Sequence, residues 1–324
     1  MNMTAYLRER YEKLEETERQ ALLESLTDRY PELVLKRFAR FERFGMHTHT
    51  AVYELAGSEF VFVPGDTVTL GWESFTSGFD ESTRQDVEET LEEYEIPDSE
   101  TFIRSLMSPV RTAAVGSMLV ECKLREIGWR TVDPDSEELT ENSKEEIRKF
   151  EMSSSRMLTI YKTLRLSRSE AGTVVELYEA VSYETFLQQL QLKGFTLPSE
   201  DEWEYLCGGG SRLLWRWGDS FHYDMRIKHF EDPDHVGKPY DLELPNHFGI
   251  SIAYDPYRFE VVDSPCLFKG GDGGSNICGG LGIALGYLPV ATYFRGHSWD
   301  ESTLEAYKAD IGGDYTFYRR VIRL

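Results

Sequence analysis

The spacing of apolar residues along the chain changes character near residue 55. Over residues 4–44, apolar side chains recur every three or four positions, which is the period of an amphipathic helix. Pro31 stands where a second helix would begin. We therefore predict an N-terminal helical hairpin, an appendage over residues 1–55 whose apolar stripe packs on the rest of the protein or on a partner.

From residue 56 the pattern favours short strands and short helices. Apolar runs separated by turn residues predict strands at residues 59–72, 110–124 and 174–178, the first of them interrupted by a Pro-Gly turn. Helical spacing and start signals predict helices at residues 80–94, 182–192 and 199–207. Residues 133–149 are rich in charged residues and predict a surface insertion of loop and helix. This mixture predicts an α+β body over residues 56–324 with surface insertions.

Composition narrows the class of partner. Hydrophobic residues make up 40% of the chain, enough for a folded core. The 57 acidic residues outnumber the 35 Lys and Arg residues, giving a formal net charge of -22. That charge repels phosphates and anionic membranes, so we expect neither nucleic acid nor a membrane as a partner.

Two further features indicate the compartment. No apolar run approaches the roughly 20 residues that cross a bilayer, and residues 1–28 lack a signal-peptide core. The cysteines are irregularly spaced and form no CxxC pair, which is typical of a reducing environment. We therefore expect a cytoplasmic protein. The four cysteines are Cys122, Cys207, Cys266 and Cys278.

Four segments carry a resemblance to a known family. They are FVFVPGDTVTLG (60–71), the stretch from SPVR to MLVE (108–121), VSYETF followed by GFTLPSEDEWEY (181–186 and 194–205), and WRWGD (215–219). In this order they resemble the "IPGGTFxMG", "PxHxVxxxxFxIxxxEVT", "VSWxDAxxF…RLPTEAEWEY" and "YPWGN/D" motifs of the formylglycine-generating enzyme, or sulfatase-modifying factor, family. The resemblance spans residues 58–324 and implies an irregular, C-type-lectin-like body.

The third segment also has a physical reading of its own. Ser199 is placed to cap a helix whose first turn carries three acidic residues, which the positive end of a helix favours. Trp203 then faces the interior. We therefore predict structural roles for both residues.

The resemblance also bears on chemistry. Formylglycine-generating enzymes hold copper(I) on two cysteines near a C-terminal Gly-Gly-Ser segment. Ser275 and Cys278 match the family's Ser-x-x-Cys, but the second cysteine position falls on Ile283 or, aligned from the other side, on Tyr287. Because copper(I) needs two soft ligands, we expect a diverged, non-catalytic protein without a cofactor. The alternative is a copper-dependent oxidase of a substrate thiol, with Cys266 completing the pair.

For the non-catalytic protein we expect a protein or small-molecule ligand in a C-terminal cleft. The residues expected to line this cleft are Ser275, Asn276, Cys278, Tyr287, Arg295 and Trp217. A third interpretation is a structural protein that binds its partner through the N-terminal helices.

Two places are weaker candidates for a metal. Asp255 and Glu260 are oxygen donors where the family has a calcium loop, although Pro256 stiffens this segment. His47 and His49 have the spacing that puts two imidazoles on one face of a strand, which metals use. A pair of surface histidines is the favoured interpretation of that motif.

Overall fold

The computed structural model describes residues 3–228, 238–296 and 300–324. The α+β class is confirmed, since helices accompany several antiparallel sheets. The chain forms two compact units: unit 1 holds Met1–Leu124, Leu190–Ser298 and Tyr318–Leu324, and unit 2 holds Arg125–Gln189 and Trp299–Phe317. No helix within the described ranges is both long and apolar enough to cross a membrane. The division at residue 55 into appendage and body stays a prediction.

Unit 1 is built on a five-stranded antiparallel sheet with the strand order β1-β2-β3-β6-β15. Its central strands are almost wholly buried, as the continuous apolar runs in the sequence indicate. The strands are β1 (Val34–Arg43), β2 (Met46–Leu55), β3 (Ser58–Val63), β6 (Met118–Glu121) and β15 (Val321–Arg323).

The predicted second N-terminal helix is wrong, because residues 34–43 form strand β1. Phe38, Phe41 and Phe44 recur every third position and so imitate a helical stripe. The chain instead turns at Phe44 and Gly45, both at positive φ (51° and 75°), and β1 pairs with β2 along its length. Two residues of positive φ make the tight turn that suits a hairpin. Cross-strand pairing therefore overrides the helical spacing.

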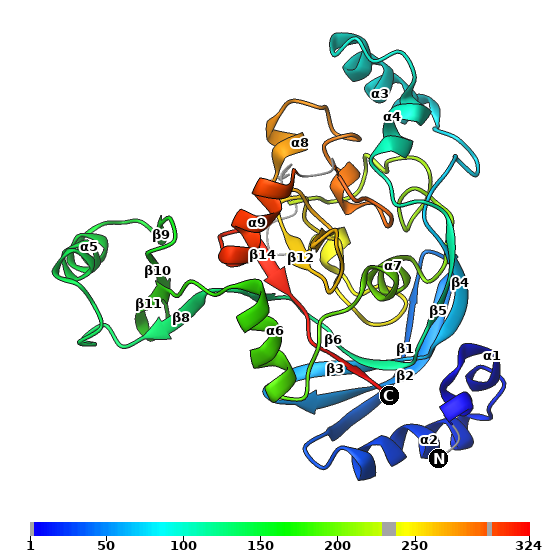
Figure 1. Ribbon diagram of the computed structural model, residues 1–324, viewed down its shortest axis with the longest axis horizontal. Helices are drawn as coiled ribbons and strands as arrows, with labels where there is room; N and C mark the ends of the chain where they lie inside the picture. The colour runs from blue at the N-terminus through cyan, green and yellow to red at the C-terminus, as the bar shows by residue number, and fades with distance from the viewer. Residues whose placement is uncertain (1–2, 229–237, 297–299) are drawn as a thin grey trace. The chain divides into compact units, whose positions relative to one another are not determined.

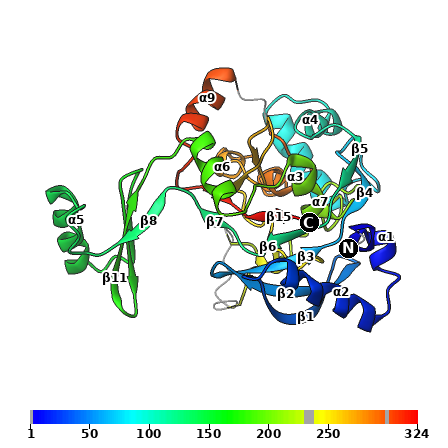
Figure 2. The same ribbon diagram turned by 60° about the horizontal axis from the view of Figure 1, so that its bottom comes forward.

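The remaining N-terminal helices lie beside this sheet (Figures 1 and 2). They are η1 (Met3–Tyr6), α1 (Arg8–Tyr11) and α2 (Glu16–Arg29). The ring of Tyr11 packs on that of Phe62, with 5.1 Å between centroids. The hydroxyl of Tyr53 on β2 donates to the carbonyl of Leu23 on α2 at 2.8 Å. The helical segment is thus anchored to β2 and β3 by buried aromatic side chains.

The rest of unit 1 consists of short elements joined by long loops. Strands β4 (Asp66–Leu70) and β5 (Arg111–Val115) pair with each other, as do β12 (Phe259–Val261) and β13 (Phe268–Lys269). The other helices are α3 (Glu81–Glu93), α4 (Ser99–Ser105), α7 (Glu200–Gly208), η3 (Asp241–Glu243), α8 (Ser275–Cys278) and η4 (Leu288–Val290). These include the strands predicted within residues 59–72 and 110–124 and the helices predicted at 80–94 and 199–207.

Helix α7 forms where its sequence signals place it. The Ser199 hydroxyl accepts the backbone N–H of Glu202, and the Glu202 carboxylate accepts that of Ser199, which makes a capping box. Gly209 ends the helix in the left-handed region, at φ 61°. Trp203 is fully buried in the core of unit 1. Its indole lies so close to Gly270 that a side chain there would clash, since an added Cβ would come within 2.8 Å of the ring.

Buried arginines donate hydrogen bonds to backbone carbonyls of unit 1 in loops, in η3 and at the end of β6. Arg216 donates to the carbonyls of Ile252, Ala253 and Leu242, and Arg319 donates to those of Glu121 and Ser251. Buried carbonyl groups need such partners wherever no sheet or helix supplies them. Arginine provides them because it carries five donors on one planar group.

Unit 2 has its own small core. It contains a four-stranded antiparallel sheet of order β8-β11-β10-β9, and Ile147 and Phe150 of helix α5 pack with Leu166 and Val175 of the sheet. Its elements are β7 (Arg125–Glu126), β8 (Trp129–Val132), α5 (Glu141–Met152), β9 (Met157–Ile160), β10 (Leu164–Ser169), β11 (Gly172–Tyr178), α9 (Glu301–Ala309), most of α6 (Tyr183–Leu192) and part of β14 (Thr316–Tyr318). The insertion predicted at residues 133–149 lies in this unit.

Removal of the Trp203 indole should destabilise the protein far more than loss of the cap. We expect Trp203→Ala to cost about 3 to 5 kcal/mol, because it leaves a cavity in the core, and Ser199→Ala to cost about 1 kcal/mol. Equilibrium denaturation of both variants measures the two changes. A Trp203→Ala variant as stable as the parent protein would contradict the placement of α7.

Candidate functional site

Three of the six candidate ligand residues, Ser275, Asn276 and Cys278, lie on a glycine-rich loop after β13. The Asp272 carboxylate organises this loop by accepting the backbone N–H groups of Gly274 and Asn276 at 2.8 and 2.9 Å. Burial raises the pKa of Asp272, although these hydrogen bonds oppose the rise. Gly274 has φ 85°, and an added Cβ would come within 2.2 Å of the Tyr257 ring. The loop is therefore held in one conformation against Tyr257.

Cys278 is exposed at the end of α8, the single helical turn of this loop. Its sulfur lies 2.8 Å from the hydroxyl oxygen of Tyr257. Ser275 and Asn276 hold the loop itself, since the Ser275 hydroxyl donates to the carbonyl of Asp272 and the Asn276 amide to that of Leu285. Of these three candidates, Ser275 and Cys278 are exposed and Asn276 is partly buried.

Tyr287 and Trp217 lie in an aromatic cluster of the core. Tyr287 is 1% exposed and packs on Phe221 at 5.5 Å between ring centroids. Trp217 stacks on Trp215, with 5.7 Å between centroids and 5° between planes. The Trp215 indole N–H donates to the backbone carbonyl of Tyr287 at 3.1 Å. These contacts give both candidates a packing role.

Arg295 takes part in an ion pair at the start of α7. It donates to both carboxylate oxygens of Glu200, at 3.0 and 2.6 Å. Burial raises the pKa of Glu200, but the Arg295 hydrogen bond and the charges of Lys269 and Arg111 outweigh burial and lower the pKa to about 2. The six residues predicted for the cleft are thus distributed over three different surroundings.

The two candidate calcium ligands compensate positive charges. The Asp255 carboxylate lies 3.2 Å from the Lys228 ammonium and 3.5 Å from the Arg258 guanidinium. Glu260 accepts two hydrogen bonds from Arg319 at 2.7 and 2.8 Å, and both residues are almost fully buried. Among residues 3–228, 238–296 and 300–324, no group of three or more His, Cys, Asp or Glu side chains is placed to hold a metal ion.

A buried charge network that the sequence did not reveal surrounds α7. Glu204 and Lys269 are both fully buried, and the ammonium lies 2.8 Å from the carboxylate. Arg111 on β5 bridges Glu204 and Asp201 at 3.0 and 2.6 Å. Because a buried charge needs a partner, this network fixes α7 against β13 and β5.

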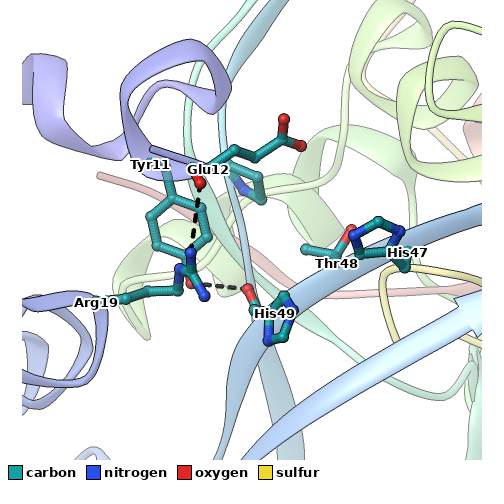
Figure 3. A pocket seen from close by; sticks show the side chains of 7 residues that line it. Tyr11, Glu12, Arg19, His47, Thr48 and His49 are labelled. Carbon is teal, nitrogen blue, oxygen red and sulfur yellow. Dashed lines mark hydrogen bonds between the residues drawn. The ribbon is translucent and has the colours of Figure 1, made fainter. Parts of the chain in front are cut away.

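His47 and His49 line a pocket of about 330 Å³ on unit 1 (Figure 3). The pairing of β2 with β3 runs from Leu55–Ser58 to Val52–Val61, so the beginning of β2 extends beyond it. Here the Tyr11 hydroxyl donates to the carbonyl of His49 at 2.7 Å. We call this cavity the histidine pocket; it is lined by Tyr11, Glu12, Arg19, His47, Thr48, His49 and Pro64.

The two imidazoles lie beside each other in this pocket. Their ring centroids are 6.0 Å apart, and the planes are nearly perpendicular. Both residues are exposed, whereas Thr48 between them is buried. The strand spacing in the sequence anticipated this pair, but nothing in the sequence indicated that Tyr11, Arg19 and Thr48 complete a cavity with it.

Comparison with known proteins adds no further restriction on function. No protein-family model matches the chain, and no curated protein matches it in sequence. Function is therefore argued from the residues and their geometry.

Neutralising Glu204 should destabilise the protein strongly. Among the described residues, Glu204→Gln leaves the buried Lys269 ammonium with only the Glu200 carboxylate, at 3.5 Å, so we expect a loss of about 3 kcal/mol. Asp201→Asn is the matched control, because Asp201 binds the same Arg111 but is 45% exposed; it should cost less than about 1 kcal/mol. Urea denaturation compares the two, and equal losses would show that burial does not govern the network.

Acidification should destabilise the protein through His247. Burial, assisted by Arg8 and Arg216, lowers the pKa of this histidine to about 3. Below the ordinary histidine pKa of about 6.5 the unfolded chain therefore binds more protons than the folded one, and stability falls as pH falls. Between pH 7 and pH 5 we expect a loss of about 2 kcal/mol from this group. Denaturation of His247→Leu over the same range should show a correspondingly shallower slope; an unchanged slope would contradict the assignment.

Proposed function

We propose that this chain is a diverged, non-catalytic protein with a formylglycine-generating-enzyme-like, C-type-lectin-like body, which binds a protein or small ligand at the loop that carries Cys278. Two of the segments that resemble the family support the proposal by their packing. Strands β3 and β4 with their Pro-Gly turn form the first, and α7 lies in the second. The Tyr205 hydroxyl of α7 donates to the carbonyl of Pro64 in that turn at 2.8 Å.

The contact that Cys278 makes is the main observation in favour of a non-catalytic protein. The Cys278 sulfur contacts the Tyr257 hydroxyl, at 2.8 Å. A phenol is a hard and mostly protonated group, which makes it a poor ligand for copper(I). The two aligned positions for a second cysteine are no better, since Ile283 packs against the core and Tyr287 is buried among aromatic rings. The loop therefore suits recognition of a ligand better than thiol oxidation.

A copper-dependent oxidase acting on a substrate thiol is the second candidate. One observation favours it: Cys266 is partly exposed and Cys278 is exposed, whereas Cys122 and Cys207 are buried. Burial raises the pKa of the Cys266 thiol despite the nearby Lys269 and Arg295 charges, so a thiolate there is disfavoured. This opposes the pair of thiolates that the reaction requires.

The two candidates are separated by an assay for the oxidation product. The copper-loaded full chain is incubated in air with a sulfatase-type cysteine peptide, and mass spectrometry detects conversion of the cysteine to the aldehyde. We expect no conversion above that of a Cys278→Ser variant, because the metal would lack its second thiolate. Conversion that Cys278→Ser abolishes would overturn the proposal, and its loss in Cys266→Ser as well would identify the second ligand.

A further inference from the structure

The histidine pocket lies apart from the loop of Cys278 and outside most of the segment that resembles a known family. We propose that it binds a small ligand bearing an oxyanion, a phosphate or carboxylate group, between Arg19, His47, His49 and the hydroxyl of Thr48. This site is independent of the proposed function. Its lining residues come from the N-terminal helices, from β2 and from the turn before β4.

The charges around the pocket favour an anion. His49 stands opposite Arg40 on β1, and Arg19 reaches the pocket from α2. Burial lowers the pKa of His49, and the positive charges of Arg19, Arg40 and His47 lower it further, against an opposing effect of Glu16. The groups that disfavour a proton on His49 favour a negative charge beside it. Arg19 thus brings a positive charge to this pocket in a protein of net charge -22.

Of the acidic residues near the pocket, Glu12, Asp66 and Glu42 pair with arginines, whereas Glu16 raises the pKa of His49. The Glu12 carboxylate lies 3.4 Å from the Arg8 guanidinium, and Arg8 also pairs with Asp66 at 3.3 Å. Figure 3 shows the Arg19 guanidinium hydrogen-bonded to the backbone carbonyl of Glu12, whereas the Glu12 carboxylate points away from it. The Glu42 carboxylate, opposite His47, pairs with Arg40. An incoming anion therefore meets mainly positive or neutral groups.

Two polar groups at the pocket lack hydrogen-bond partners among the described residues. Arg19 donates through Nη2 to the carbonyls of Leu14 and Glu12, at 2.8 and 3.4 Å, while its Nε is buried and unpaired. The Thr48 hydroxyl is also buried and unpaired, on a residue that is 6% exposed. An unpaired buried donor is costly, and an oxyanion that reached either atom would relieve that cost.

The dimensions of the pocket suggest what carries the oxyanion. Its volume of about 330 Å³ is at the lower end of the range for small-molecule sites. The Tyr11 ring and Pro64 contribute apolar wall, which suits the organic part of a ligand. We therefore infer a small organic phosphate or carboxylate.

Binding should be linked to protonation of His49. An anion in the pocket stabilises the imidazolium, so the pKa of His49 rises on binding and the complex takes up a proton. Affinity is then higher below the pKa of the complex and falls as pH rises through it. Arg19, Arg40, His47, Glu16 and the neutral Tyr11 are the groups around His49 that set this balance.

Titration calorimetry on the full chain at low salt tests the proposal with three probes. Inorganic sulfate keeps its charge between pH 5.5 and 8, and we expect its affinity to fall several-fold over that range. Phenyl phosphate and benzoate then distinguish phosphate from carboxylate as the preferred group. Absence of saturable binding of all three probes at pH 5.5 would overturn the proposal.

Variants locate the binding. Arg19→Gln should weaken binding of the preferred probe about tenfold or more, because a charged hydrogen bond is lost, and His49→Gln should remove most of the pH dependence. Arg29→Gln is the matched control, since it removes the same charge about 15 Å further along α2; it should leave affinity within about twofold. Equal weakening by Arg19→Gln and Arg29→Gln would show only a general charge effect and contradict the site.

The nuclear magnetic resonance signals of the histidines provide a readout on the unaltered protein. Saturation with phenyl phosphate should raise the titration midpoints of His47 and His49, assigned through His47→Gln and His49→Gln. The buried His247 should not respond. Binding seen by calorimetry without a shift of either midpoint would place the anion elsewhere and overturn the proposal.

Discussion

Buried charged side chains hold unit 1 together where regular secondary structure is sparse. Arg216 donates to the carbonyls of Ala253 and Leu242, and Arg319 donates to those of Glu121, at the end of β6, and Ser251. The Lys269–Glu204 pair ties the short strand β13 to α7. An unpaired buried carbonyl or charge costs more free energy than a lost surface contact. The buried arginines therefore supply hydrogen bonds to backbone groups that inter-strand hydrogen bonds do not reach. The glycine-rich loop begins directly after Lys269 and is positioned by this network.

That support explains why the residues predicted to line one cleft have different surroundings. Tyr287 and Trp217 pack in the aromatic core, and Arg295 forms an ion pair with Glu200 at the start of α7. Cys278 is exposed, beside Tyr257. A rigid loop that presents one thiol can recognise a ligand, but two soft ligands would be needed to hold copper(I). A fold like that of the family therefore does not imply the family's reaction in this chain.

The N-terminal segment adds a second site of a different kind. Tyr11 fixes α1 against the end of β2, and Arg19 reaches back from α2 to the carbonyls before it. As a result, helix, strand and turn leave a cavity that Arg19 and two histidines line in a protein whose overall charge is strongly negative. Local potential in a partly enclosed pocket depends on the nearest groups, because salt screens the distant ones.

The sequence alone determined the features that depend on neighbouring residues. The cap and first turn of α7, the strands around the Pro-Gly turn and the helix after residue 80 follow from signals a few positions long, and the structure has them there. The spacing of His47 and His49 likewise put two imidazoles on one face of a strand.

Tertiary structure decided whatever depends on residues distant in sequence. Strand β1 exists because β2 pairs with it, although its phenylalanines are spaced as in a helix. Glu204 and Lys269 are 65 positions apart, and Glu260 and Arg319 are 59 apart. The histidine pocket needs Arg19 and Tyr11 from helices that the sequence could not place. Local propensities are small and additive along the chain, whereas burial and charge pairing depend on which surfaces meet, and only the folded chain settles that.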